Sequence, residues 1–458
     1  MKKQLLSFVT LLCVVWLTPT RAAAYDFWVD GIYYNITSSS NPLTVEVTHN
    51  YNYNIVYAGA ITIPERVTYN NVTYRVTNIG DYAFRECTGL TSVEIPASVT
   101  SIGREAFFNC RGLTSIVIPA SVTSIGKYAF EFCSGLTSIA IPGSVTSIGE
   151  SAFNGCSSLT SIEIPASVTS IGNWVFANCT GLTLIEIPAS VVSIGEYAFQ
   201  SCSGLTSVEI PASVTSIGQE AFAGCSGLTS IVVAAGNPKY DSRENCNALI
   251  ETSSNTLLIG CKTTVIPASV TSIGEGAFAG CTGLTSIEIP ASVTSIEDGA
   301  FGGCSGLTSI EIPASVTSIE AYAFYGCLGL TSIEIPASVT FIGGYAFKNC
   351  LGLTKIITRA IVPPTCSNYT WSNVNKSITL YVPAGTKAAY ATAEGWKDFI
   401  KIKEFDATEI TTLDAEASDM NFSDSEIYTM GGQRVDELQA GMNIVRMKNG
   451  KVKKIIKR

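Results

Sequence analysis

Residues 102–124 read IGREAFFNCRGLTSIVIPASVTS, and the pattern IGxxAFxxCxGLTSIxIPASVTS returns every 23 residues. Seven copies follow one another directly, and four more resume after a divergent interval. The copies start at Ile79, Ile102, Ile125, Ile148, Ile171, Ile194, Ile217, Ile273, Ile296, Ile319 and Ile342. A fixed period of this length indicates a solenoid, in which each copy is one structural repeat that contacts only its neighbours.

Within one copy, the apolar residues indicate a short strand followed by a return turn. Leu90, Val93 and Ile95 alternate with polar residues, which predicts a strand with one buried face. Pro96 ends this strand because it has no N–H to give to a ladder. A short helical or turn segment should then carry the remaining buried residues, which are Val99, Ile102, Ala106, Phe107 and Cys110.

Glycine occurs at two positions of the repeat, for which we expect different roles. Gly89 precedes the strand and is expected to supply an unusual φ there. The glycine after the first Ile should not need a positive φ, since Glu297 and Glu320 replace it in two copies.

The fold class follows from the need to stack these units. One copy cannot bury enough apolar surface to offset the entropy of ordering its own residues. Stacking supplies the missing burial through continuous strand ladders and rows of like side chains. The sequence therefore predicts a right-handed repeat solenoid of parallel β ladders with short helical or turn segments, closed by β caps and followed by a small C-terminal β module.

The repeated unit LTSIxIPxSVTSIGxxAFxxC resembles the BspA-type leucine-rich repeat of bacterial surface proteins. The resemblance covers residues 79–358. It implies a leucine-rich-repeat array on the surface of a member of the Bacteroidetes. It also implies adhesion to host matrix proteins, other bacteria or epithelial cells.

Five regions are expected along the chain. Residues 1–24 have a basic start, an apolar stretch and an Ala-Ala-Ala site, which predicts a signal peptide and an exported protein. Residues 25–78 read as an N-terminal β cap, and residues 79–358 as the leucine-rich repeats. Within the repeats, residues 232–272 diverge and contain a hairpin, which we interpret as a spacer, with a binding insertion as the alternative. Residues 359–405 read as a C-terminal cap.

Residues 406–458 should form a separate β module of two hairpins. One hairpin is expected around the Gly-Gly pair at 431–432, and the other around the turn at Asn449-Gly450. The module resembles the sorting tail of the type IX secretion system, which carries a "GQRV … G … IV … NGK" run. The alternative is a purely structural module, since lysines blunt the pairing of exposed strand edges.

Composition argues against most classes of enzyme and against nucleic-acid binding. The chain has one histidine, His49, which we expect to be an ordinary cap residue, so multi-histidine metal sites and most triads are excluded. The net charge is −9, and removal of the three basic residues of the leader gives −9 − 3 = −12, which disfavours nucleic acid and anionic lipid. No further apolar run reaches 18 residues, so no transmembrane anchor is predicted. We expect no enzyme activity, no cofactor and no metal.

Eleven cysteines share one position of the repeat. Equivalent side chains in a stacked array point in parallel, whereas a disulfide needs Cβ atoms that converge. We therefore expect buried free thiols that behave as small apolar side chains. A bridge between Cys246 and Cys261 across the hairpin stays open as an alternative.

Two sets of residues are candidates for a binding face. An outward row of carboxylates follows the central Ile or Val of the strands: Glu94, Glu163, Glu186, Glu209, Glu288, Glu311 and Glu334. Aromatic residues vary on the invariant frame at Tyr82, Tyr128, Trp174, Tyr197, Tyr322 and Tyr345. The carboxylates could also be a solvated face that keeps the sheet soluble, and a catalytic pair is disfavoured because a flat ladder offers no pocket. Threonine and serine hydroxyls beside the carboxylates are expected to satisfy one another.

These observations favour a secreted or surface binding protein, an adhesin for host or bacterial surface proteins. The alternatives are a structural surface-coat protein and a glycan-processing accessory enzyme. The residues beyond 405 contain no His or Cys and are too few for a catalytic domain, which disfavours the enzyme.

Overall fold

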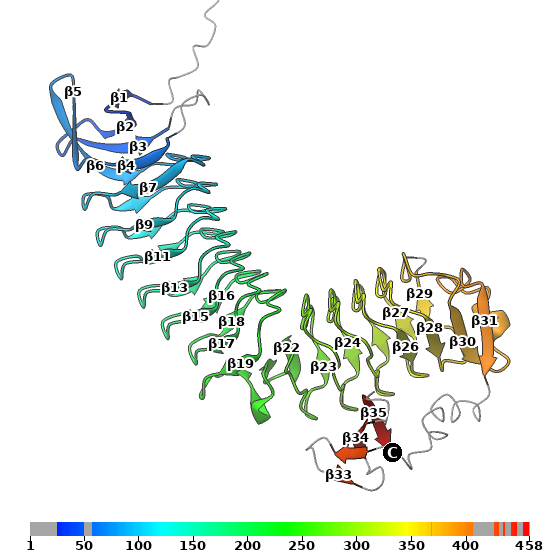
Figure 1. Ribbon diagram of the computed structural model, residues 1–458. Helices are drawn as coiled ribbons and strands as arrows, with labels where there is room; N and C mark the ends of the chain where they lie inside the picture. Colours follow the sequence, from blue (N-terminus) through cyan, green and yellow to red (C-terminus); the bar gives the residue numbers. More distant parts are fainter. Residues whose placement is uncertain are drawn as a thin grey trace, which may run out of the picture. The chain divides into compact units, whose positions relative to one another are not determined.

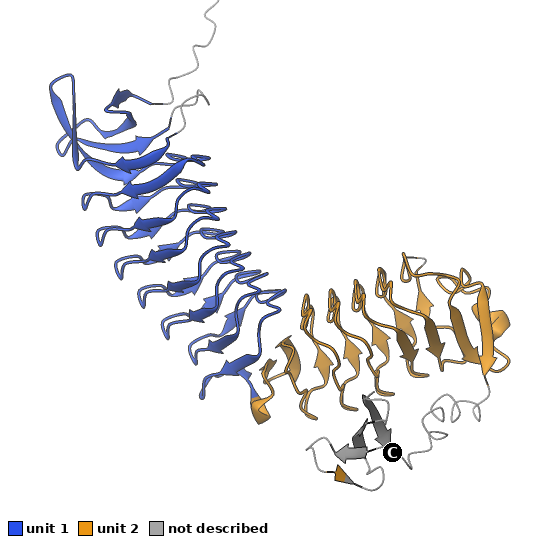
Figure 2. Ribbon diagram, viewed as in Figure 1, with its two compact units in different colours: residues 1–242 blue, residues 243–458 orange. Residues whose placement is uncertain are grey.

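The computed structural model describes residues 25–49, 57–367 and 369–405, together with four short strands between residues 426 and 457 (Figure 1). The chain divides into two compact units, residues 1–242 and 243–458 (Figure 2). Both units contain stacked turns of a parallel β-solenoid with almost no helix, as the repeat predicts. The expected leader, residues 1–24, lies outside the described residues.

The first ladder of unit 1 takes one strand from each repeat. All its strands are parallel, and apart from a register shift between the first two they pair in register, so that Ser138 lies beside both Ser115 and Ser161. The strands are β4 (Gly59–Thr62), β7 (Leu90–Glu94), β9 (Ser115–Val117), β11 (Ser138–Ala140), β13 (Ser161–Glu163), β15 (Leu184–Glu186), β17 (Ser207–Ile210) and β19 (Ser230–Val233). The central Ile or Val of each strand points into the core, and its two neighbours point outward.

A second, shorter ladder runs along the Ser-Ile pair of each repeat. It begins at β6 (Val72–Ile79) and continues through β8 (Ser101–Ile102), β10 (Ser124–Ile125) and β12 (Ser147–Ile148). The Ser-Ile pairs of the next three repeats form a separate three-stranded sheet of β14 (Ser170–Ile171), β16 (Ser193–Ile194) and β18 (Ser216–Ile217).

The AFxxC segment is a turn, and it also joins neighbouring repeats. The N–H of Phe107 donates to the carbonyl of Ala129 in the next repeat at 2.7 Å, and Phe84 donates to Ala106 in the same way. Each repeat is therefore hydrogen-bonded to the next at three places, the two ladders and this turn. The backbone N–H and C=O groups of the turn find partners in the neighbouring repeat, so no helix is needed to pair them.

The glycine expected to supply an unusual φ has a different role. Gly89 and its counterparts in the other copies do not have a positive φ, so that expectation is wrong. A Cβ added at Gly112 would instead lie 2.5 Å from the carbonyl oxygen of Thr88, in the preceding repeat. The glycine permits close approach of two turns. The glycine after the first Ile has no positive φ, as expected.

Aromatic rings form a continuous column inside each unit. In unit 1, seven phenylalanines from Phe84 to Phe222 stack at centroid distances of 5.0 to 5.7 Å. In unit 2, four phenylalanines from Phe278 to Phe347 continue onto Trp371. These rings are almost fully buried, so they supply much of the apolar contact between repeats.

The N-terminal cap is a small sheet that joins the second ladder. Strands β1 (Phe27–Val29), β2 (Ile32–Ser38) and β3 (Thr44–Thr48) are antiparallel, and β3 pairs in parallel with β6. Strand β5 (Arg66–Tyr69) is antiparallel to β6 and pairs with its first half, residues 72–75. These strands agree with the β cap expected at residues 25–78.

The divergent interval, residues 232–272, contains the boundary between the two units, and its hairpin lies in a ladder of unit 2. The expected hairpin is present as β21 (Ala248–Glu251) and β22 (Thr256–Gly260). Its second strand pairs in parallel with β23 (Ser272–Ile273), and Leu249 and Leu257 are fully buried. The hairpin therefore continues the ladder, and the interpretation of this interval as a spacer rather than a binding insertion stays a prediction.

Unit 2 has two ladders and a closing segment. One ladder continues from β23 through β24 (Ser295–Ile296), β25 (Ser318–Ile319), β27 (Phe341–Ile342) and β29 (Thr365–Cys366). The other contains β26 (Ser332–Ile335), β28 (Lys355–Thr358), β30 (Thr379–Pro383) and β31 (Lys401–Phe405). The closing segment contains one short helix, α1 (Lys387–Tyr390).

The C-terminal strands pair as two hairpins, as expected. They are β32 (Glu426–Thr429), β33 (Arg434–Val435), β34 (Gly441–Arg446) and β35 (Val452–Lys457), in the order β33-β32-β34-β35. All three pairings are antiparallel, which agrees with a small β module.

Candidate binding surfaces and the N-terminal pocket

The carboxylate row is continuous only in the middle of unit 1. Glu163 on β13 lies directly beside Glu186 on β15, and Glu209 occupies the equivalent position on β17. All three side chains are exposed. Neighbouring strands lie about 4.8 Å apart, so these carboxylates form one charged stripe along the ladder.

The other predicted glutamates do not extend this stripe. Glu94 faces Val117 across the ladder and accepts a hydrogen bond from the Thr62 hydroxyl at 3.2 Å. Glu288 and Glu311 lie on segments that form no strand, although their sequence repeats that of the strands.

Glu334 lies on β26 but forms an ion pair with Arg359. The sequence could not reveal this pair because Arg359 lies just beyond the repeats.

The threonine hydroxyls beside the stripe are held by the backbone. Thr183 donates to the carbonyl of Thr160 at 3.3 Å, and Thr206 donates to the carbonyl of Thr183 at 3.4 Å. The expectation that these hydroxyls satisfy one another is therefore wrong, because each bonds to the previous rung. Leu184 interrupts the serine row beside them and is 60% exposed.

The predicted aromatic positions share a left-handed backbone. The residues Tyr82, Tyr128, Trp174, Tyr197, Tyr322 and Tyr345 have φ values between 56° and 62°. Gly276 and Gly299 occupy the same position with φ of 60° and 62°. A non-glycine residue is strained here, so this position would suit glycine on backbone grounds.

The structure brings some of these rings together. Trp174 stacks on Tyr197 at 4.2 Å between centroids in unit 1. In unit 2, Tyr322 stacks on Tyr345 at 5.1 Å, and Tyr345 stacks on Tyr369 at 5.4 Å. Tyr369 lies outside the repeat pattern, and the sequence reasoning missed it.

The cysteines are free and buried, as predicted. None of the fourteen described cysteines forms a disulfide, including Cys246 and Cys261, for which a bridge had stayed open. The row is not purely apolar, because the Cys202 thiol donates to the carbonyl of Phe176 at 3.1 Å. Burial raises the pKa of Cys281 to about 11 and that of Cys87 to about 12, so both are neutral at physiological pH.

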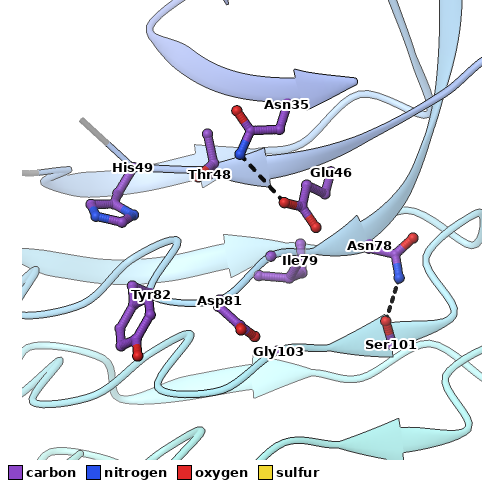
Figure 3. A pocket seen from close by; sticks show the side chains of 11 residues that line it. Asn35, Glu46, Thr48, His49, Asn78, Ile79, Asp81, Tyr82, Ser101 and Gly103 are labelled. Carbon is purple, nitrogen blue, oxygen red and sulfur yellow. Dashed lines mark hydrogen bonds between the residues drawn. The ribbon is translucent and has the colours of Figure 1, made fainter. Parts of the chain in front are cut away.

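A pocket that the sequence reasoning missed lies where the N-terminal cap meets the first repeats. It is a cavity of about 480 Å³. Its lining comes from β2, β3, β6, β8 and the turn after β6, and Figure 3 shows the side chains around the opening. The polar lining residues are Asn35, Glu46, Thr48, His49, Asn78, Asp81, Tyr82 and Ser101.

Two carboxylates dominate the charge of this pocket. Burial raises the pKa of Glu46, the hydrogen bond from the Asn35 amide at 3.4 Å opposes that shift, and the nearby Asp81 adds to it. The Asp81 carboxylate accepts the backbone N–H of Arg104 at 2.7 Å, which fixes its direction. Burial lowers the pKa of His49, and the charge of Arg85 adds to this effect, so the imidazole is neutral at pH 7.

Comparison with known protein families identifies the type of repeat. The family model described as "BspA type Leucine rich repeat region (6 copies)" matches residues 64–183, 131–249 and 255–377, more than half of the chain. The chain belongs to the BspA-type leucine-rich repeat family. No curated protein sequence matches it.

Solved structures of other repeat proteins are similar to this BspA-type chain. A leucine-rich cell surface protein from Faecalibacterium prausnitzii is 33% identical, with a TM-score of 0.59 over 72% of this chain and 94% of its own. The pneumococcal vaccine antigen PcpA has the same fold at 18% identity, with a TM-score of 0.57 over 84% of this chain and 100% of its own. Family and fold together indicate a surface leucine-rich-repeat protein.

Two further findings bear on how such a protein could act. Among the described residues, no three or more His, Cys, Asp or Glu side chains gather in a way that could hold a metal ion. No helix in the same part of the chain is long and apolar enough to cross a membrane.

Proposed function

We propose that this BspA-type protein is an exported, non-enzymatic adhesin that binds a basic surface of another protein, on a host or a bacterium. The observation that carries the proposal is the stripe of Glu163, Glu186 and Glu209 on consecutive rungs of unit 1. Like charges directly opposite one another destabilise a sheet. In the described part of the chain, none of the three has an ion-pair partner.

The surroundings of the stripe support a protein as the partner. Leu184 presents an exposed apolar side chain on the same strand as Glu186. Val232 follows Glu209 in register and is also exposed. A protein interface typically combines such apolar contacts with complementary charge, which sets the orientation and the rate of association.

The test is the triple substitution Glu163→Gln, Glu186→Gln and Glu209→Gln in the mature chain. Binding to surfaces coated with extracellular-matrix proteins should weaken, and the remaining binding should lose most of its salt dependence. A charge-matched control, Glu196→Gln, Glu244→Gln and Asp398→Asn, changes exposed carboxylates outside the stripe. Equal affinity of the two variants for the same ligand would contradict the proposal.

Export and display are part of the same proposal. The leader at residues 1–24 and the sorting role of residues 406–458 rest on their sequence patterns. The antiparallel β module supports the sorting role only in its strand content. We propose that the module directs the folded solenoid through the outer membrane to the cell surface.

A further inference from the structure

The pocket beneath the N-terminal cap is a separate site from the carboxylate stripe. Its volume of about 480 Å³ falls in the range of small-ligand sites. Its lining contains two carboxyl groups, Glu46 and Asp81, and no Lys or Arg, and burial keeps His49 neutral at pH 7. The pocket therefore disfavours anions and favours a cation.

The two carboxylates have acceptor capacity left for a ligand. Neither Glu46 nor Asp81 forms an ion pair among the described residues. Among the described residues, each accepts one hydrogen bond, from the Asn35 amide or from the Arg104 N–H. A carboxylate can accept about four hydrogen bonds, so most of this capacity remains unused.

We propose that this pocket binds a protonated nitrogen group, the guanidinium of an arginine side chain on a partner protein. A guanidinium carries five N–H donors in a planar fork, which suits two separate carboxylates better than a compact ammonium does. The amide oxygens of Asn35 and Asn78 and the Ser101 hydroxyl supply further acceptors. The choice of a protein as the source rests on the proposed adhesin function, whereas the cation preference rests on the pocket alone.

The rings at the pocket agree with a cationic group. Tyr82 lies in the lining, and the His49 ring meets it edge to face at 6.0 Å. The guanidinium carbon of Arg85 lies 5.8 Å from the centre of the Tyr82 ring, so this ring already takes part in a cation–π contact. A second guanidinium near the same ring would gain this attraction but would also be repelled by Arg85, so the two carboxylates must supply the net binding energy.

The experiment is calorimetric titration of the mature chain with three probes. The peptide acetyl-Gly-Arg-Gly-amide should bind saturably, and the same peptide with neutral citrulline should bind at least about tenfold more weakly. Agmatine is the free guanidinium probe. If agmatine binds and the arginine peptide does not, a protein side chain as the source is contradicted. Equal binding of the arginine and citrulline peptides contradicts a charge-selective site.

Isosteric variants locate the binding. Glu46→Gln and Asp81→Asn keep the acceptors for the Asn35 amide and the Arg104 N–H, so the cap should remain folded, and circular dichroism checks this. Each variant should weaken the binding of the arginine peptide by about tenfold or more in Kd, because a charged hydrogen-bond partner is lost. Glu94→Gln, an exposed carboxylate of the same unit, is the control and should bind as the parent does. Unchanged binding in both pocket variants, or none in the parent, overturns the proposal.

The failure of this site can be told apart from failure of the adhesin stripe. The variant with Gln at positions 163, 186 and 209 should keep its full affinity for the arginine peptide. If that variant no longer binds the peptide while the pocket variants bind it as the parent does, the cation site lies on the stripe and the pocket proposal is wrong.

Discussion

The column of phenylalanine rings allows a quantitative test of how the repeats stabilise one another. Phe153 is fully buried and stacks on Phe130 at 5.4 Å and on Phe176 at 5.7 Å. Phe222, at the end of the same column, is 5% exposed and stacks only on Phe199, at 5.0 Å. Substitution of either ring by Leu keeps apolar volume but removes its stacking.

The expected loss follows from counting stacked pairs. Each pair is worth about 0.5–1.5 kcal/mol beyond the area it buries, so Phe153→Leu should lose about twice the stacking energy that Phe222→Leu loses. Nearest-neighbour coupling in a solenoid predicts that this difference appears in global stability. Urea unfolding of the mature chain, followed by circular dichroism, measures it as a shift in midpoint at constant slope. Equal destabilisation by the two variants would refute the reasoning.

Three further results are expected. Gly135→Ala should destabilise the chain, because the new Cβ would lie 2.3 Å from the carbonyl oxygen of Arg111, whereas Gly143→Ala meets nothing within 4 Å and should be neutral in a thermal melt. Thiol titration should detect few groups in the native mature chain and all fourteen after denaturation, and a lack of free thiols then would contradict the parallel array. Deletion of residues 409–458 should leave a folded solenoid trapped in the periplasm on cell fractionation, and its release to the exterior would reduce the tail to a structural module.

The sequence reveals the repeat because its period is fixed. A 23-residue spacing places equivalent residues on neighbouring rungs, so the contact of Glu163 with Glu186 and the free thiols could both be predicted. The same spacing says little about contacts with residues outside it. Arg359 lies just beyond the last full copy, and its pairing with Glu334 needed coordinates.

The pocket could not be predicted for a similar reason. Asn35, Glu46 and Asp81 belong to β2, β3 and the first turn, and residues 25–78 contain no repeat that would relate them. The repeat position of Asp81 gives no signal either, because Glu150 and Glu196 place carboxylates at the same position of other copies.

The left-handed turn position explains why the aromatic residues vary while the core does not. A left-handed backbone costs a non-glycine residue roughly 1–2 kcal/mol. A stacked neighbour returns about 0.5–1.5 kcal/mol, as between Trp174 and Tyr197. These opposing effects nearly cancel, so the fold accepts Tyr322 and Gly299 at equivalent positions with little net change in stability. Folding stability therefore does not determine which residue occupies this position. We infer that contacts made by the surface of each turn determine it.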